Sequence, residues 1–188
     1  MNSMVPGVSF KDGVLTADQI KAVRELIDRQ NPSKWVHSTN IAPERGVGVT
    51  ACDYDLLFDR VLTEDERQFL QSLVPQLPGA IIRTQVINRY KVGGFLCDHT
   101  DRQNAVHNTI IPLQSSEVDG LRYYDRTKRP VSEGLIPDVA GRMTIISDPF
   151  LVHGVAPVKS ERFVFITIYA DEREKGWNPY EDLYQNRA

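Results

Sequence analysis

A histidine and an aspartate stand one residue apart in the segment NRYKVGGFLCDHTDRQ, residues 88–103. Residues i and i+2 of an extended chain point to the same side, so His99 and Asp101 can offer an imidazole and a carboxylate to one point. Two imidazoles and one carboxylate on one face of an octahedron form a mononuclear non-haem iron(II) site, whose opposite face stays open. A lone His-x-Asp triplet arises easily by chance, so this interpretation requires a third ligand and a suitable scaffold.

The third ligand is predicted to be His153 in LVHGVAPV, which lies between strand-like runs that a jelly roll can bring beside His99. Arg162 follows nine residues later and opens the apolar strand RFVFITIY. An arginine there needs a partner, and a carboxylate that accepts two hydrogen bonds is the best geometric match. In 2-oxoglutarate, one end chelates iron and the distal carboxylate extends toward a basic side chain. Asn88 and Tyr90 alternate on the strand that enters the site, where both can hydrogen-bond this co-substrate.

Each of these residues also has a structural interpretation. The triplet can be a hydrogen bond between a turn aspartate and a surface histidine, and His153 can be a core histidine near a turn. The polar residues of the entering strand can be ordinary strand residues. For Arg162 the alternative is a surface ion pair with an acidic residue near it in sequence: Glu161, Asp171 or Glu172.

Two amphipathic helices are predicted in the first part of the chain. In LTADQIKAVRELIDRQ, Thr16 precedes Gln19 by three residues, the spacing of a capping box, and the apolar residues that follow lie on one helical face. TEDERQFLQSLVPQL repeats this plan with Thr63 and Glu66. Pro75 is expected to end or kink the second helix, because proline lacks a backbone N–H.

The hydrophobic pattern changes to short strands after residue 80. Five runs rich in β-branched and aromatic residues are bounded by Gly, Pro, Asp or Asn: AIIRTQVINRY, HNTIIPL, GLRYYD, GRMTIIS and RFVFITIYA. Helices followed by many short strands predict an α+β fold, with a β-sandwich or jelly roll buttressed by N-terminal helices. Residues 115–141 show little apolar periodicity and are predicted to be a long loop or an interrupted strand, often a functional lid at this length.

The composition is that of an ordinary globular protein. The 188 residues, 41% of them hydrophobic and 25% charged, predict one domain with N-terminal support (1–79), a core carrying the metal site (80–170) and a tail (171–188). The formal net charge of -3 gives no electrostatic reason to expect nucleic acid or a membrane surface as partner. We expect a cytoplasmic location, because the sequence shows no signal peptide, no transmembrane run and only two cysteines.

The segments NRYKVGG, HTD and HGVAPVKSERFVFITIY together resemble the iron(II)/2-oxoglutarate-dependent oxygenase superfamily. The later segments resemble its prolyl-hydroxylase-like branch, and the Asn-x-Tyr lead-in is similar to that of the AlkB-type nucleic-acid demethylases. The resemblance implies a double-stranded β-helix (jelly roll) that uses iron(II), 2-oxoglutarate and O2. It implies as iron ligands His99, Asp101 and His153, and as 2-oxoglutarate-binding residues Arg162, Tyr90 and Asn88.

Three functions stay open. The first is a dioxygenase that hydroxylates an unactivated C–H bond of a protein residue, amino acid or small metabolite, releasing succinate and CO2. Halogenating relatives carry a small residue at the carboxylate ligand, so the intact Asp101 favours hydroxylation. The second is a non-catalytic metal-binding jelly roll, in which Arg162 has no role. The third is an AlkB-type demethylase, disfavoured because Ile168 stands where those enzymes carry a second arginine. The sequence predicts neither the substrate nor the oligomeric state.

Overall fold

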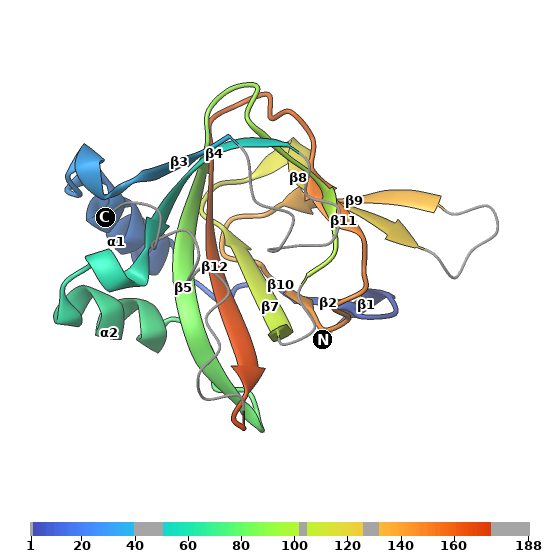
Figure 1. Cartoon of the computed structure of the whole chain (residues 1–188), viewed down its shortest axis with the longest axis horizontal. Coiled ribbons are helices and arrows are strands. Elements are labelled where there is room, and N and C mark those ends of the chain that lie inside the picture. The colour runs from blue at the N-terminus through green and yellow to red at the C-terminus, as the bar shows by residue number, and fades with distance from the viewer. Residues whose placement is uncertain (1, 40–50, 102–104, 126–131, 174–188) are drawn as a thin grey trace.

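The computed structural model describes residues 2–39, 51–101, 105–125 and 132–173 (Figure 1). The described helices are α1 (Ala17–Asp28) and α2 (Glu64–Ser72), with short 3-10 turns η1 (Pro32–Lys34) and η3 (Asp59–Val61). The described strands are β1 (Asn2–Val5), β2 (Val8–Lys11), β3 (Val36–Ser38), β4 (Cys52–Phe58), β5 (Ala80–Tyr90), β6 (Phe95–His99), β7 (Ala105–Pro112), β8 (Ser116–Asp125), β9 (Ser132–Asp138), β10 (Met143–Ile146), β11 (His153–Val155) and β12 (Arg162–Asp171).

Both helices begin at the predicted capping boxes. The Thr16 hydroxyl accepts from the Gln19 backbone N–H at 3.2 Å, and Gln19 Oε1 accepts from the Thr16 N–H at 2.9 Å. Thr63 and Glu66 make the same reciprocal pair at 3.4 and 3.0 Å. Such caps satisfy backbone donors that have no partner within the helix. The second helix ends before Pro75, as its missing N–H predicts.

The strands form one curled antiparallel arrangement of two sheets that face each other. Along the strand path, β1-β2-β10-β7-β12-β5-β4 makes the larger sheet and β4-β6-β11-β8-β9 the smaller one. Strand β4 belongs to both, because Asp55–Phe58 pair with β5 whereas Cys52 and Asp53 pair with β6. Figure 1 shows the curl as a half-barrel with α1 and α2 on one side of it. This confirms the predicted jelly roll with helical support.

The larger sheet separates two apolar cores. On β12, Phe163 and Phe165 pack on the helix side with residues of α1 and α2, whereas Val164 belongs to the cluster between the two sheets. Strand β5 alternates in the same way, with Ile87 toward the helices and Val86 toward the interior. Burial on both faces explains why β12, with the sequence RFVFITIYAD, is almost continuously apolar. A polar side chain on the interior face of either strand therefore needs a specific partner.

The prediction of a long loop over residues 115–141 was wrong for much of that region. Strands β8 and β9 pair there, with a register shift between Ser116 and Gly120 that fits the alternative of an interrupted strand. Strand β9 ends the strand path and contains Gly134 and Pro137, both of which weaken a strand pattern. The glycine leaves room for the Tyr123 ring, since a Cβ at Gly134 would lie 2.3 Å from Cζ of that ring and the ring would have to move.

The longest described helix, α1, has 12 residues. Within the described ranges, no helix is both long and apolar enough to cross a membrane.

Candidate metal centre

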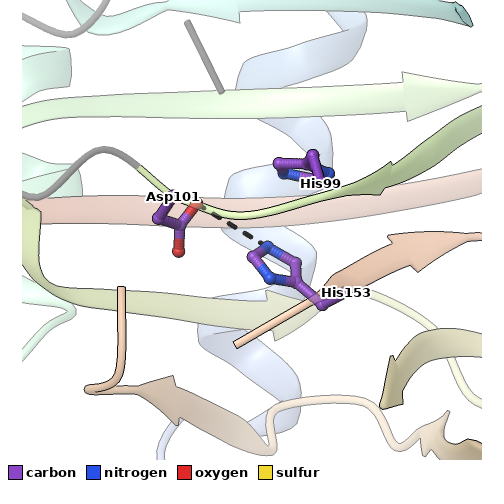
Figure 2. A group of neighbouring side chains, drawn as sticks. All are labelled: His99, Asp101 and His153. Atoms are coloured by element: carbon purple, nitrogen blue, oxygen red, sulfur yellow. Dashed lines mark ion pairs between the residues drawn. The ribbon is translucent and has the colours of Figure 1, made fainter. Parts of the chain in front are cut away.

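The three predicted ligands converge at the end of the smaller sheet. His99 ends β6 and His153 begins β11, and the two residues are direct cross-strand partners with ring centroids 4.4 Å apart. Asp101 follows His99 by two residues and returns toward the same point (Figure 2). His153 Nε2 lies 3.7 Å from Asp101 Oδ1, and one ligand atom from each residue lies within 4.8 Å of the others. The structure therefore gathers all three residues, as the sequence predicts.

Backbone carbonyls fix the tautomer of both imidazoles. His99 Nδ1 lies 3.0 Å from the Cys97 carbonyl oxygen, and His153 Nδ1 lies 3.0 Å from the Leu151 carbonyl oxygen. A carbonyl only accepts hydrogen bonds, so Nδ1 must carry the proton in each ring and Nε2 keeps its lone pair. This orientation by a hydrogen bond on the far nitrogen is usual for metal-ligating histidines.

The protonation state also suits a metal. Burial, with a smaller contribution from the neighbouring His153, lowers the pKa of His99 to about 4. The His99 ring is therefore neutral at pH 7, and protons compete for its lone pair only in acid. Two imidazoles and one carboxylate form a donor set that fits iron(II).

An ion-pair network on the outer face of the smaller sheet braces the two histidine strands. Asp98 Oδ1 accepts from Arg122 Nη2 at 2.7 Å, and Asp98 Oδ2 accepts from the Tyr124 hydroxyl at 2.8 Å. A Cβ at Gly154, the residue after His153, would lie 2.6 Å from Asp98 Oδ1. Asp98 thus connects β6 to β8 and lies against β11. Sequence reasoning missed this role, although strand alternation places Asp98 on the face opposite His99.

Replacing Asp98 with alanine is expected to lower the free energy of unfolding by about 1–3 kcal/mol, since Arg122 and Tyr124 lose their shared acceptor. Urea unfolding of the metal-free protein measures this loss. The matched control is Glu161→Ala, which removes a more exposed carboxylate paired with Arg89 and should cost about 1 kcal/mol or less. Equal losses in the two variants would contradict a bracing role for Asp98.

Arg162 lies inside the barrel and not at the surface. It is the direct cross-strand partner of Tyr90, it shares the interior face of β12 with Val164, and only 1% of it is exposed. Its partner is Asp138 at the end of β9, which accepts from Nε at 2.6 Å and from Nη2 at 3.0 Å. The surface ion pairs considered for Arg162 were therefore wrong. Of the described acidic neighbours considered, Glu161 pairs with Arg89 and Asp171 with Arg173.

Tyr90 and Asn88 lie on the same interior face as Arg162. The Tyr90 ring centroid is 5.3 Å from the Arg162 guanidinium carbon and 5.1 Å from the ring of Tyr54. Burial raises the pKa of Tyr90 and outweighs the opposing effects of Arg162 and Asn88, so its hydroxyl stays protonated. Asn88 Oδ1 is buried and has no hydrogen-bond partner among the described residues. The interior thus holds one hydroxyl donor and one unpaired amide oxygen beside the arginine.

Sequence reasoning also missed two interior residues. Asp138 falls in the region predicted as a loop, so its position opposite Arg162 could not be inferred from periodicity. Tyr123 is the cross-strand partner of His153 on β8 and packs against the interior core. Its place in the predicted strand GLRYYD was the available signal, but strand order was needed to bring it beside His153.

Comparisons with known proteins identify the fold. No protein-family model matches the sequence, and no curated protein sequence matches it. A prolyl-4-hydroxylase from Pseudomonas putida is 20% identical, with a TM-score of 0.66 over 88% of this chain and 93% of that chain. A Trichoplax adhaerens prolyl hydroxylase, in complex with a peptide of hypoxia inducible factor, is 16% identical with a TM-score of 0.64 over 90% and 86%. HygX from Streptomyces hygroscopicus, with nickel and 2-oxoglutarate bound, is 10% identical with a TM-score of 0.61 over 92% and 85%. The chain therefore has the double-stranded β-helix fold of 2-oxoglutarate/iron(II) oxygenases, whereas the AlkB-like lead-in stays a prediction.

Proposed function

We propose that this chain is an iron(II)- and 2-oxoglutarate-dependent dioxygenase that hydroxylates an unactivated C–H bond of a small molecule or a protein residue. The observation that carries the proposal is the convergence of His99, Asp101 and His153 within 4.8 Å. Both imidazoles present Nε2 lone pairs, because backbone carbonyls hold Nδ1 of each ring. Three ligands on strand ends leave coordination positions for a co-substrate and dioxygen, which distinguishes a catalytic site from a closed structural one.

The residues on the interior face of β5 and β12 would bind the co-substrate. The terminal N–H groups of Arg162 indicate that the ligand carries a carboxylate, because a guanidinium matches carboxylate geometry. The Tyr90 hydroxyl is a second donor, and the buried Asn88 lies on the same face of β5, two residues before it. The apolar residues between the sheets keep water from this region, which strengthens each polar contact.

The chemistry supplied by bound iron(II) and 2-oxoglutarate is oxidative decarboxylation to succinate and CO2, coupled to hydroxylation of the substrate. The protein's own part is to hold the ligands in the correct tautomer, to orient the co-substrate and to keep the site dry. The pKa of His99, lowered by burial, keeps that ligand neutral at pH 7. An Asp at position 101 completes the donor set, so hydroxylation is favoured over halide transfer.

The anaerobic iron(II) protein is expected to develop a visible charge-transfer band on addition of 2-oxoglutarate, because chelation by the 2-oxo acid changes the electronic structure of the metal site. Absorption spectroscopy and calorimetry measure the response. Succinate release is then screened against amino acids, peptides and oligonucleotides to identify the substrate class. A protein that binds iron but shows neither a band nor heat with 2-oxoglutarate would be a metal-binding module, and the proposed function would be rejected.

A further inference from the structure

The guanidinium of Arg162 already has a carboxylate partner inside the barrel. Asp138 accepts from Nε and Nη2, and only 2% of either side chain is exposed. A guanidinium has five N–H donors, so this pair leaves the Nη1 donors and one Nη2 donor for another acceptor. Among the described residues, Asp138 is the one carboxylate that pairs with Arg162.

Charge balance determines what a second carboxylate would do at this position. When both are ionised, Arg162 and Asp138 carry no net charge. A second carboxylate on the same guanidinium would leave one uncompensated negative charge in a buried site, which is strongly unfavourable. Protonation of one carboxylate restores neutrality, and a protonated carboxyl still has an oxygen that accepts from the guanidinium.

Among the ionisable groups at this pair and beside it, Asp138 is the one that can take up the proton. They are Asp119 on β8 and Tyr90 on β5, besides Arg162 itself on β12. Burial raises the pKa of Tyr90, so it is already protonated. Burial opposes ionisation of Asp119, but hydrogen bonds from the segment just before Arg162 outweigh it and lower the pKa of that carboxyl. Burial raises the pKa of Asp138, and its bonds to Arg162 offset this only in part.

We propose that Asp138 positions Arg162 in the co-substrate subsite and takes up one proton when the distal carboxylate of 2-oxoglutarate binds the free terminal N–H groups. The inference rests on the proposed function, because 2-oxoglutarate must enter this site. In the free protein Asp138 is ionised and holds the Nε edge of Arg162. In the complex the proton comes from solvent, and Asp138 becomes a neutral carboxylic acid beside an arginine that pairs with the ligand.

Calorimetric titration of the anaerobic iron(II) protein with 2-oxoglutarate tests this coupling. The titration is repeated at one neutral pH in buffers of different ionisation enthalpy, so that the slope of the observed enthalpy gives the number of protons exchanged. We expect uptake of about one proton per ligand by the unmodified protein, and an affinity that falls up to about tenfold per pH unit above neutrality. Asp138→Asn keeps an acceptor for Arg162 but cannot titrate, so it should bind with no net uptake and little dependence on pH.

Two controls separate Asp138 from other sources of protons. Glu161→Gln removes the carboxylate that immediately precedes β12 and pairs with Arg89 of β5. This variant should retain the uptake. A monocarboxylic 2-oxo acid such as 2-oxobutanoate can chelate the metal but has no distal carboxylate, so it should bind without uptake. The unfolding midpoint of Asp138→Asn, followed by circular dichroism, shows whether that variant is folded.

The outcomes distinguish this inference from the proposed function. If 2-oxoglutarate binds the unmodified protein without proton uptake, or if folded Asp138→Asn retains the uptake, the role of Asp138 is wrong while the enzyme class stands. If 2-oxoglutarate does not bind the unmodified iron(II) protein, the proposed function fails and the inference fails with it. The titration of the unmodified protein decides the matter even if the variant does not fold.

Discussion

Alanine at His153 is expected to reduce iron(II) affinity by more than about 100-fold, because even groups that only support a metal ligand contribute 10- to 100-fold. The same loss is expected for His99→Ala and Asp101→Ala, since each variant leaves two protein ligands. Metal content after dialysis against a fixed concentration of free iron(II) measures the effect. Succinate release should fall in parallel.

The matched control for these ligand variants is His107→Ala. His107 lies on β7, outside the three-residue cluster of Figure 2, and its variant should bind iron normally. The ligand variants should keep their fold without metal, because β6 and β11 pair through their backbones and not through the metal. Undiminished iron stoichiometry in folded His99→Ala and His153→Ala would disprove the metal centre.

Loss of Arg162 is expected to weaken 2-oxoglutarate binding by about thirtyfold or more, since breaking a buried hydrogen-bonded charge contact costs roughly 2–5 kcal/mol. The single variant Arg162→Ala has a second effect, because it leaves Asp138 buried without a partner, at about 3–5 kcal/mol of stability. The informative comparison is therefore Asp138→Asn against Arg162→Gln/Asp138→Asn. The second variant lacks both charges, so the difference in 2-oxoglutarate affinity between the two variants measures the contribution of Arg162.

Calorimetric titration of 2-oxoglutarate measures the affinity of both variants, and iron binding should be largely spared in both. The affinity of Arg162→Lys should lie between that of the parent and that of Arg162→Gln/Asp138→Asn, because lysine keeps the charge but loses the two-pronged geometry. An affinity of Arg162→Gln/Asp138→Asn within about threefold of Asp138→Asn would show that Arg162 does not bind the co-substrate. The buried pair would then be purely structural.

The elements that local chemistry determines were predictable from sequence. Thr16 with Gln19, and Thr63 with Glu66, form capping boxes because the partners are three residues apart and need nothing from the rest of the fold. The strand AIIRTQVINRY coincides with β5 because its apolar side chains are buried on both faces of the larger sheet. Long, strongly patterned segments carry their own signal.

The candidate site was predictable where spacing within the chain determines it and unpredictable where sheet pairing does. The i, i+2 relation of His99 and Asp101 is local, and His153 was identified by its position between strand-like runs that a jelly roll can bring beside His99. The partner of Arg162 is different, because Asp138 reaches it from the opposite sheet. That pairing depends on strand order and on β9, whose sequence SEGLIPD lacks a clear alternation.

The strand path has consequences for how the molecule opens. The path begins at β1 and ends at β9, and β4 joins the two sheets by backbone hydrogen bonds. In the part of the chain that the structure describes, no backbone ladder joins β9 to the larger sheet. Short turns join the two sheets beside Asp138, because β9 ends at Asp138 and β10 begins at Met143, whereas β7 ends at Pro112 and β8 begins at Ser116. The chain itself therefore tethers the end of β9 that carries Asp138 to the larger sheet, and we expect any local opening between the sheets to begin at the far end of β9 and not at the Arg162–Asp138 pair.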